Sequence, residues 1–101
     1  MLRKTYSKNR KTCKVTFSFP AAAAPEAKKV ALVGDFNNWD QEAMPLKKTP
    51  EGSWETVVSL QTGREYSFRY LVDDARWEND WNADKYSPSP YGDSDNSVVI
   101  V

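Results

Sequence analysis

Three stretches of the chain alternate between apolar and polar residues. They run from Thr12 to Phe19, from Trp54 to Leu60 and from Tyr66 to Val72. Because successive side chains of a β-strand point to opposite faces, a period of two predicts three strands with one buried face each. The side chains expected in the core are Cys13, Val15, Phe17, Phe19, Trp54, Val58, Leu60, Tyr66, Phe68, Tyr70 and Val72.

A continuous apolar run at Val30–Gly34 leads directly into a polar loop. An apolar run of this length predicts a central strand with both faces covered. Gly34 can adopt backbone angles that other residues avoid, and the polar residues that follow can bond to their own backbone. These polar residues are Asp35, Asn37 and Asn38. We therefore expect a tight, ordered loop that carries Trp39 outward on a rigid base.

Turn residues separate these strands. A Pro-Glu-Gly-Ser sequence at 50–53 and Gly63 mark two turns. The four alanines at 21–24 lie between prolines and are too few to sustain a helix, so we expect a loop there with at most one turn. A short strand or edge segment is expected at Met44 and Leu46.

The last quarter of the chain combines a turn-rich segment with a closing strand. Residues 78–95 are rich in Asn, Asp and Pro, which predicts a long surface excursion, and residues 98–101 predict the last strand. No stretch has the pattern of an amphipathic helix. Short strands separated by turns predict an all-β fold, a β-sandwich.

The 101 residues suffice for one domain, and the net charge is zero. The two signs are nevertheless segregated. Residues 1–14 hold six basic residues and no acid, whereas residues 73–95 hold seven acids against Arg76 and Lys85. A basic arm can bind nucleic acid. We favour instead a solvated N-terminal arm at residues 1–10 that leans on the acidic end of a single domain at residues 11–101, and expect no nucleic acid as partner.

The composition removes several kinds of chemistry. Cys13 is the only cysteine and there is no histidine. A disulfide within the chain and imidazole-based catalysis or metal binding are therefore excluded, and we expect no metal and no cofactor. No apolar run approaches the roughly 20 residues of a membrane helix, and no apolar segment of a secretory signal follows the basic N-terminus. We expect a cytoplasmic protein that does not contact a membrane.

Four acids could form a carboxylate pair of the kind that glycosidases use. They are Asp73, Asp74, Asp80 and Asp84. Each lies beside Asn, Ala or other turn residues, and a sandwich of this size offers no deep cleft to enclose a substrate. We therefore assign these acids to turns.

Exposed aromatic residues with polar neighbours indicate a different chemistry. Trp39 follows two asparagines, Trp77 follows Arg76 just past a turn, and Arg69 lies on the polar face of the preceding strand. A sugar ring has an apolar C–H face and a rim of hydroxyls, so it needs a flat aromatic platform edged by Asn, Arg, Lys or Asp. Packing within a hairpin is the alternative for Trp77 and Trp81. Trp54 alternates with core residues and is assigned to the core.

Three blocks of the sequence, in this order, resemble carbohydrate-binding module family 48. They are Gly-Asp-Phe-Asn-Asn-Trp at 34–39, Tyr-Ser-Phe-Arg-Tyr-Leu-Val-Asp at 66–73 followed by Trp77, and Asn-Ser-Val-Val-Ile-Val at 96–101. This family includes N-terminal domains of isoamylases and branching enzymes and the glycogen-binding domain of the AMP-activated protein kinase β subunit. The resemblance, from about Lys11 onward, implies an immunoglobulin-like (early-set) β-sandwich of about seven or eight short strands.

The resemblance also implies a sugar site. Trp39 and Trp77 would stack on glucose, while Arg69 and Asn96 would contact hydroxyls. Ser94 matches a threonine of the family, and Tyr91 is the nearest counterpart of an apolar residue that enters the sugar ring, although Gly92 can align there instead. Two features depart from the family. The turn at 73–76 is one residue longer than a tight Asp-Gly turn, and Trp81 stands where the kinase subunit has proline.

These observations favour a non-catalytic module that binds an α-glucan such as glycogen or a starch-like polymer. The alternative is a docking module whose aromatic surface meets a glucan-metabolising enzyme or a kinase-like partner, since an exposed apolar patch serves either purpose. An α-glucan hydrolase acting alone is disfavoured, because the catalytic barrel needs roughly 250 residues.

Overall fold

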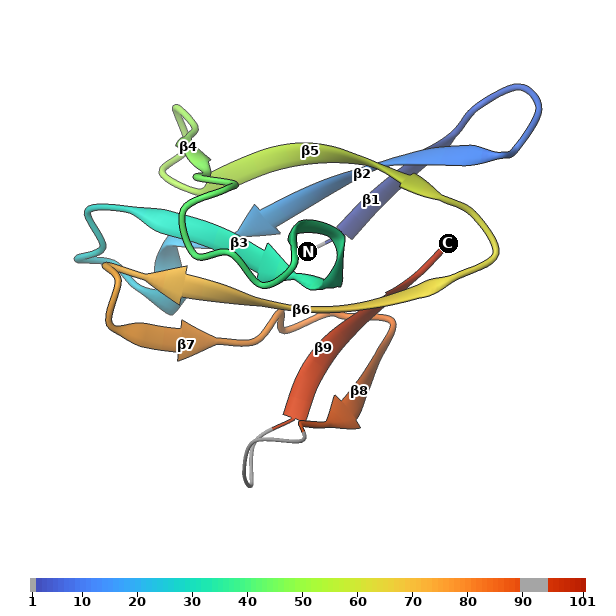
Figure 1. Ribbon diagram of the computed structural model, residues 1–101. Coiled ribbons are helices and arrows are strands. Elements are labelled where there is room, and N and C mark those ends of the chain that lie inside the picture. The colour runs from blue at the N-terminus through green and yellow to red at the C-terminus, as the bar shows by residue number, and fades with distance from the viewer. Residues whose placement is uncertain (1, 90–94) are drawn as a thin grey trace.

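The predicted all-β sandwich is confirmed. The computed structural model describes residues 2–89 and 95–101, which form two antiparallel sheets. The first sheet has the strand order β1-β2-β5-β4 and the second β3-β6-β9-β8, with β7 also paired to β6 (Figure 1). The strands are β1 Leu2–Tyr6, β2 Thr12–Phe19, β3 Val30–Gly34, β4 Lys47–Lys48, β5 Trp54–Gln61, β6 Glu65–Val72, β7 Arg76–Glu78, β8 Lys85–Pro88 and β9 Asp95–Ile100.

The core between the sheets comes from the alternating strands. All four apolar residues predicted for β2 are buried, and Phe68 and Tyr70 of β6 are fully buried opposite them. The ring centroids of Phe17 and Phe68 lie 5.0 Å apart in an edge-to-face arrangement, and those of Phe19 and Tyr70 lie 5.0 Å apart. Such pairs stabilise by about 0.5–1.5 kcal/mol beyond burial. Trp54, assigned to the core, is buried there.

The N-terminal segment differs from the solvated arm that the charge pattern suggested. Residues 2–6 form β1, which pairs along its whole length with β2, so this segment is part of the first sheet. It does lean on the acidic end of the chain, because Lys4 Nζ donates to Asp84 Oδ2 at 2.7 Å. This ion pair joins the edge of the first sheet to the loop before β8 in the second.

The apolar run at Val30–Gly34 forms β3, which lies at the end of its sheet rather than at its centre. Its outer edge is nevertheless occupied. The N–H of Leu32 donates to the carbonyl of Met44, and the N–H of Leu46 donates to the carbonyl of Val30. The segment at 44–46 therefore acts as the predicted edge element before the chain crosses to the first sheet as β4. At 21–23 the expected single turn is a 3-10 helix, η1 Ala21–Ala23.

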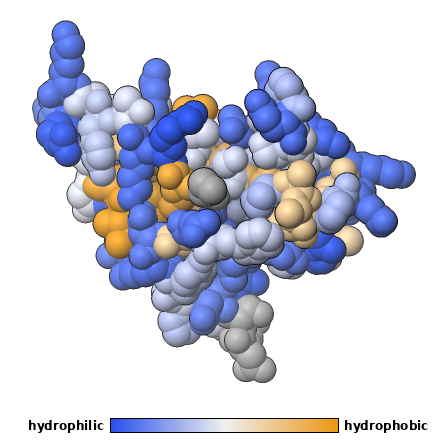
Figure 2. Space-filling model, turned by 180° about the vertical axis from the view of Figure 1, so that it is seen from behind, coloured by the Kyte–Doolittle hydropathy of each residue, from blue (hydrophilic) through white to orange (hydrophobic). Residues whose placement is uncertain are grey.

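The described part of the acidic excursion, residues 78–89 and residue 95, contains more regular structure than a surface loop. It contains β8, which pairs with β9, and Asp80, which is buried. Seen from behind, most of the surface is hydrophilic, with the strongest apolar colour on the left and a paler apolar area on the right (Figure 2). Among the described residues, no helix is long and apolar enough to cross a membrane.

Candidate functional site

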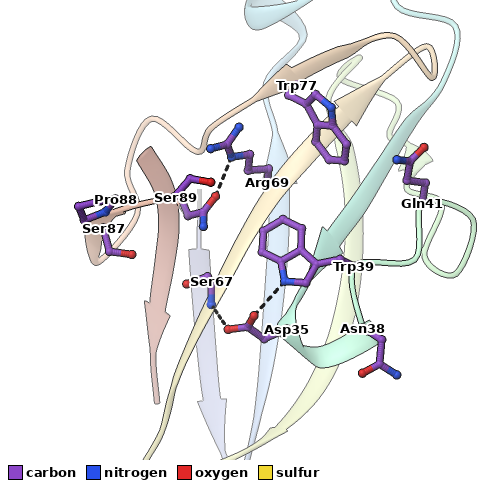
Figure 3. A pocket seen from close by; sticks show the side chains of 11 residues that line it. Asp35, Asn38, Trp39, Gln41, Ser67, Arg69, Trp77, Ser87, Pro88 and Ser89 are labelled. Atoms are coloured by element: carbon purple, nitrogen blue, oxygen red, sulfur yellow. Dashed lines mark hydrogen bonds between the residues drawn. The ribbon is translucent and has the colours of Figure 1, made fainter. Parts of the chain in front are cut away.

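A groove runs over the outer face of the second sheet. Its volume is about 770 Å³, within the range of pockets that hold small-molecule ligands. Two indoles and one guanidinium dominate it (Figure 3). Its lining residues are Asp35, Asn38, Trp39, Gln41, Ser67, Arg69, Trp77, Ser87, Pro88, Ser89 and Asn96.

The loop after β3 positions Trp39 through backbone geometry that residues other than glycine adopt rarely. Asn38 and Trp39 are both left-handed, with φ of 58° and 57°. The N–H of Trp39 donates to the carbonyl of Gly34 at 2.9 Å. Asn37 ties the loop to β3, because its Nδ2 donates to the carbonyl of Leu32 and its Oδ1 accepts the N–H of Gly34. The expected ordered loop thus includes the 3-10 turn η2 Asp35–Asn37.

The indole of Trp39 is held by its polar edge. Trp39 Nε1 donates to Asp35 Oδ1 at 2.9 Å, and the other carboxylate oxygen of Asp35 accepts the N–H of Ser67 at 2.8 Å. Trp39 is 36% exposed. Because the Nε1–H group is already bonded, the indole offers the groove a π face rather than a donor.

Gly34 allows this loop to lie close to β6. A Cβ atom at Gly34 would come within 2.6 Å of the carbonyl oxygen of Ser67 and 2.8 Å of the Cβ of Phe68. Its φ of −172° is extended, so the requirement for glycine here is steric and not conformational. This differs from the expectation that Gly34 supplies unusual backbone angles.

Trp77 reaches the groove from β7. It pairs with Leu71 of β6 and is 40% exposed. The turn before it contains Asp73 and Asp74 in left-handed conformations, with φ of 52° and 57°. The Asp73 carboxylate accepts the N–H groups of Lys29 and Lys28, and these hydrogen bonds lower its pKa below the usual 3.8.

Arg69 lies on β6 between the segment paired with β9 and the segment paired with β7. On one edge of β6, β9 pairs with residues 65–68 and β7 with residues 70–72. Arg69 is therefore placed at the junction of the two strands, and its Nε donates to Asn96 Oδ1 at 2.8 Å. Asn96 is buried, so this bond fixes the stem of the guanidinium while the rest of the group faces the groove (Figure 3).

A buried polar network fixes the start of β9. Tyr70 donates its hydroxyl hydrogen to Asp80 Oδ2 at 2.8 Å, and the N–H of Asp80 donates to Ser97 Oγ at 2.8 Å. Ser97 donates to Asn79 Oδ1 from both its N–H and its hydroxyl, and Asn79 Nδ2 donates to the carbonyl of Asp95. Burial and the negative charge of Asp80 raise the pKa of Tyr70 well above its usual 10.0, so the phenol stays protonated. These hydrogen bonds hold the start of the strand that carries Asn96.

The four acids considered as a carboxylate pair lie outside the groove, in turns or internal contacts. Asp73 and Asp74 hold the β6–β7 turn against the segment before β3, with Asp74 paired to Lys29. Asp80 belongs to the buried network. Asp84 accepts from Lys4 and from the N–H of Ile100. In the described lining of the groove, Asp35 is the one acid and Arg69 the one cation.

The structure brings Trp39, Trp77, Arg69 and Asn96 to the same groove. Tyr91 and Ser94, the other predicted site residues, lie outside the described residues. Trp81 is 60% exposed and lies outside the lining of the groove.

Sequence reasoning treated Asp35 only as a turn residue and missed several lining residues, among them Gln41, Ser67, Ser87, Pro88 and Ser89. The four-residue spacing from Asp35 to Trp39 was the one signal that could have linked that pair. In the view of Figure 3, Gln41 lies on the side of the two indoles opposite Arg69.

Comparison with known proteins finds a matching family and several similar proteins. Residues 5–92 match the family described as carbohydrate-binding module 48 (isoamylase N-terminal domain). A 1,4-alpha-glucan branching enzyme of Xanthomonas campestris is 39% identical over 57 residues, which are 55% of this chain and 8% of the enzyme. The corresponding enzyme of Aquifex aeolicus is 37% identical over 67 residues, 63% of this chain and 10% of the enzyme. That of Emericella nidulans is 48% identical over 40 residues, 40% of this chain and 6% of the enzyme.

Proposed function

The chain belongs to the carbohydrate-binding module 48 family, and from this premise we propose that its groove binds α-glucan chains by stacking glucose on Trp39 and Trp77. The family match confirms the resemblance drawn from the sequence, and with it a carbohydrate-binding module. We propose three further points: that the two indoles stack on glucose, that polar side chains of the groove contact its hydroxyls, and that the ligand is an α-glucan.

One observation supports this function most directly: two exposed indoles and a fixed Arg69–Asn96 pair line the same groove. The indole faces suit the apolar C–H face of a glucose ring. The guanidinium offers several N–H donors in a fixed plane for the hydroxyls around the ring. Because Asn96 already holds Nε, the remaining donors of Arg69 are directed without loss of side-chain freedom on binding.

The charges in the groove suit a neutral ligand. Both oxygens of Asp35 are engaged with Trp39 and Ser67, which leaves Arg69 as the charged group directed at a ligand. The other polar residues in the described lining are uncharged: Asn38, Gln41, Ser67, Ser87, Ser89 and Asn96. Neutral donors and acceptors match sugar hydroxyls, whereas a polyanion such as nucleic acid needs several cations.

The names of the relatives suggest which sugar. They are 1,4-alpha-glucan branching enzymes, and the family description names isoamylase. We therefore propose an α-1,4-linked glucan such as glycogen. An open groove of this kind binds weakly, with Kd from about 1 μM to 1 mM, or about −8 to −4 kcal/mol.

Trp39→Ala, Trp77→Ala and Trp81→Ala test the proposal by affinity electrophoresis through gels containing glycogen. Trp81 is the matched control, because it is also exposed but lies outside the groove. We expect glycogen to retard the unmodified protein and Trp81→Ala equally, and to retard Trp39→Ala and Trp77→Ala much less. Equal mobility of all four proteins with and without glycogen would contradict the proposal.

A docking role is the second candidate. The chain spans only 8% and 10% of two of its branching-enzyme relatives, so in those proteins the matched region belongs to a much longer chain. This favours contact with a glucan-metabolising enzyme, with the indoles of the groove as the contact surface. Such a role predicts that Trp39→Ala leaves mobility in glycogen gels unchanged but weakens binding to a purified branching enzyme.

A further inference from the structure

We infer that Asp35 is a positioning residue for the groove: its carboxylate holds the indole of Trp39 at a fixed place relative to the strand that carries Arg69. This inference rests on the proposed function, because it concerns the same site. The sequence pattern alone assigned Asp35 to the turn after β3. The contacts of its two oxygens give it a second role.

The carboxylate bridges two elements. Asp35 Oδ1 accepts the indole Nε1–H of Trp39 at 2.9 Å, and Oδ2 accepts the backbone N–H of Ser67 at 2.8 Å. Ladder pairing of β3 with β6 ends at Gly34 and Phe68, so Ser67 lies one residue beyond the paired part of β3. The Asp35 side chain thus provides an acceptor where the backbone ladder stops.

Only a carboxylate can make both contacts. Both partners are N–H donors, and an ionised carboxylate accepts at both oxygens. An asparagine has one acceptor oxygen and one NH₂ donor, so one of the two contacts would place donor against donor. A serine at the same position has a shorter side chain with a single oxygen. Asp35→Asn therefore removes one contact while keeping the shape of the side chain.

This bridge sets the spacing within the site. Ser67 and Arg69 are on the same strand, two residues apart, and both line the groove. Fixing Trp39 to Ser67 therefore fixes its indole relative to Arg69, as Figure 3 shows. A glucose ring can contact the indole and the guanidinium together only when the two groups are at the right distance. Because Asp35 already holds the indole in place, binding does not have to order it.

The backbone of the loop makes such a restraint necessary. Asn38 and Trp39 adopt left-handed conformations, which asparagine tolerates but which strain the backbone of a residue such as tryptophan. Strained conformations persist only where surrounding contacts determine them. The backbone N–H of Trp39 is bonded to the carbonyl of Gly34, and the bond from Nε1 to Asp35 restrains the side chain itself.

The test compares Asp35→Asn with Asp40→Asn in two-dimensional ¹H–¹⁵N NMR spectra without ligand. Asp40 is the matched control: it lies in the same loop, and its Oδ1 accepts the N–H of Glu42, a contact that asparagine preserves. We expect Asp35→Asn to shift the indole Nε1–H signal of Trp39 and the amide signal of Ser67. The control should leave both signals in place, and a dispersed spectrum shows that each variant is folded.

Isothermal titration with β-cyclodextrin then measures the effect on binding. Asp35→Asn should raise Kd roughly threefold to tenfold, the expected effect of having to order one side chain on binding. Trp39→Phe keeps an aromatic face but lacks the Nε1–H donor. In that background Asp35→Asn should change Kd by much less, because the contact it removes is already absent.

The outcomes separate this inference from the proposed function. If the unmodified protein does not bind β-cyclodextrin or glycogen but Asp35→Asn still moves the Trp39 signal, the glucan proposal fails and the positioning contact stands. If the unmodified protein binds and Asp35→Asn binds equally well, or the Trp39 indole signal does not move, the positioning role is overturned. An equal effect of Asp35→Asn in the Trp39→Phe background would also overturn it.

Discussion

At the scale of single residues, Arg69 and Asn96 depend on each other. Asn96 Oδ1 accepts the Nε–H of Arg69, while Asn96 itself is buried at the start of β9. The oxygen of the asparagine holds the guanidinium. The proposed function adds a second role, in which its NH₂ group donates to a ligand. Substitutions that separate these functions test both.

Asn96→Ala and Asn96→Asp should weaken glucan binding to different degrees. Alanine releases Arg69 and removes the NH₂ donor, whereas aspartate keeps an acceptor for Arg69 and removes only the donor. We expect Kd for β-cyclodextrin to be about tenfold higher for the alanine variant than for the aspartate variant. Such a ratio corresponds to about 1.4 kcal/mol of binding free energy. Equal affinity of both variants and the unmodified protein would exclude Asn96 from the site.

Tyr70 donates a hydrogen bond to Asp80 in the buried network. Both residues are almost fully buried, so Tyr70→Phe leaves the Asp80 carboxylate without that partner. We expect the free energy of unfolding in urea to fall by about 1–3 kcal/mol. Tyr66→Phe removes the same hydroxyl from an exposed bond to the carbonyl of Gln61 and should cost less. An equal loss in both variants would show that burial of the network contributes nothing extra.

Some residues of the site could be predicted from the sequence and others could not. Trp39, Trp77, Arg69 and Asn96 were named because an aromatic residue beside polar ones is visible in the sequence, and their role in binding stays a prediction. Asp35 and Ser67 were not predicted as site residues, because their contact joins positions 32 residues apart and uses a backbone N–H. No side-chain pattern reports such a bond.

At the scale of elements, the close approach of the β3–η2 corner to β6 places the Trp39 loop. Gly34→Ala puts a Cβ 2.6 Å from the carbonyl oxygen of Ser67, so the two strands must separate. We expect a loss of about 1–3 kcal/mol in the free energy of unfolding, together with weaker β-cyclodextrin binding. Gly63→Ala is a useful contrast, since it meets no atom within 4 Å but has a φ of +77°. It should lower stability through backbone strain and leave Kd unchanged.

If Gly34→Ala lowered stability but left Kd unchanged, the spacing of the loop from β6 would not matter for binding. Equal changes of Kd in both glycine variants would show that binding responds only to global stability.

The turn before β7 predicts a dependence of stability on pH. Hydrogen bonds from Lys29 and Lys28 lower the pKa of Asp73 from 3.8, so the folded state favours the ionised form. A group with a lowered pKa stabilises the fold above its unfolded-state pKa and loses this effect as pH falls through the folded-state pKa. Asp73→Asn should therefore be less stable than the unmodified protein at pH 7, and the difference should shrink below about pH 4. Urea denaturation at pH 7 and pH 3 measures it; a constant difference would contradict the assignment.

The strands themselves were predictable to different degrees. β2, β5 and β6 were predicted because one face of each is apolar and the other polar. β1 was not, because its inward face includes Lys4, whose charge is met by Asp84 far away in the sequence. β8 was not, because it lies in a turn-rich segment and ends in Pro88. The edge position of β3 was also missed, because a two-sided apolar pattern reports burial and not strand order.

At the scale of the whole molecule, the groove and the N-terminal strand lie on different sheets. Trp39, Trp77, Arg69 and Asn96 belong to β3, β6, β7 and β9 or the loops beside them, whereas β1 and the exposed Val57 belong to the first sheet. The Lys4–Asp84 ion pair joins the two sheets at their edges. Ligand effects at the groove should therefore be confined to one side of the sandwich.

A ¹H–¹⁵N NMR titration of the protein with β-cyclodextrin tests the central claim most directly. The proposed function predicts saturable shifts of the indole signals of Trp39 and Trp77 and the amide signals of Arg69 and Asn96. Signals of the first sheet, such as those of Lys14 and Val57, should stay in place. A well-dispersed spectrum that does not change on titration, or shifts centred on the first sheet, would contradict the claim that this groove binds α-glucan.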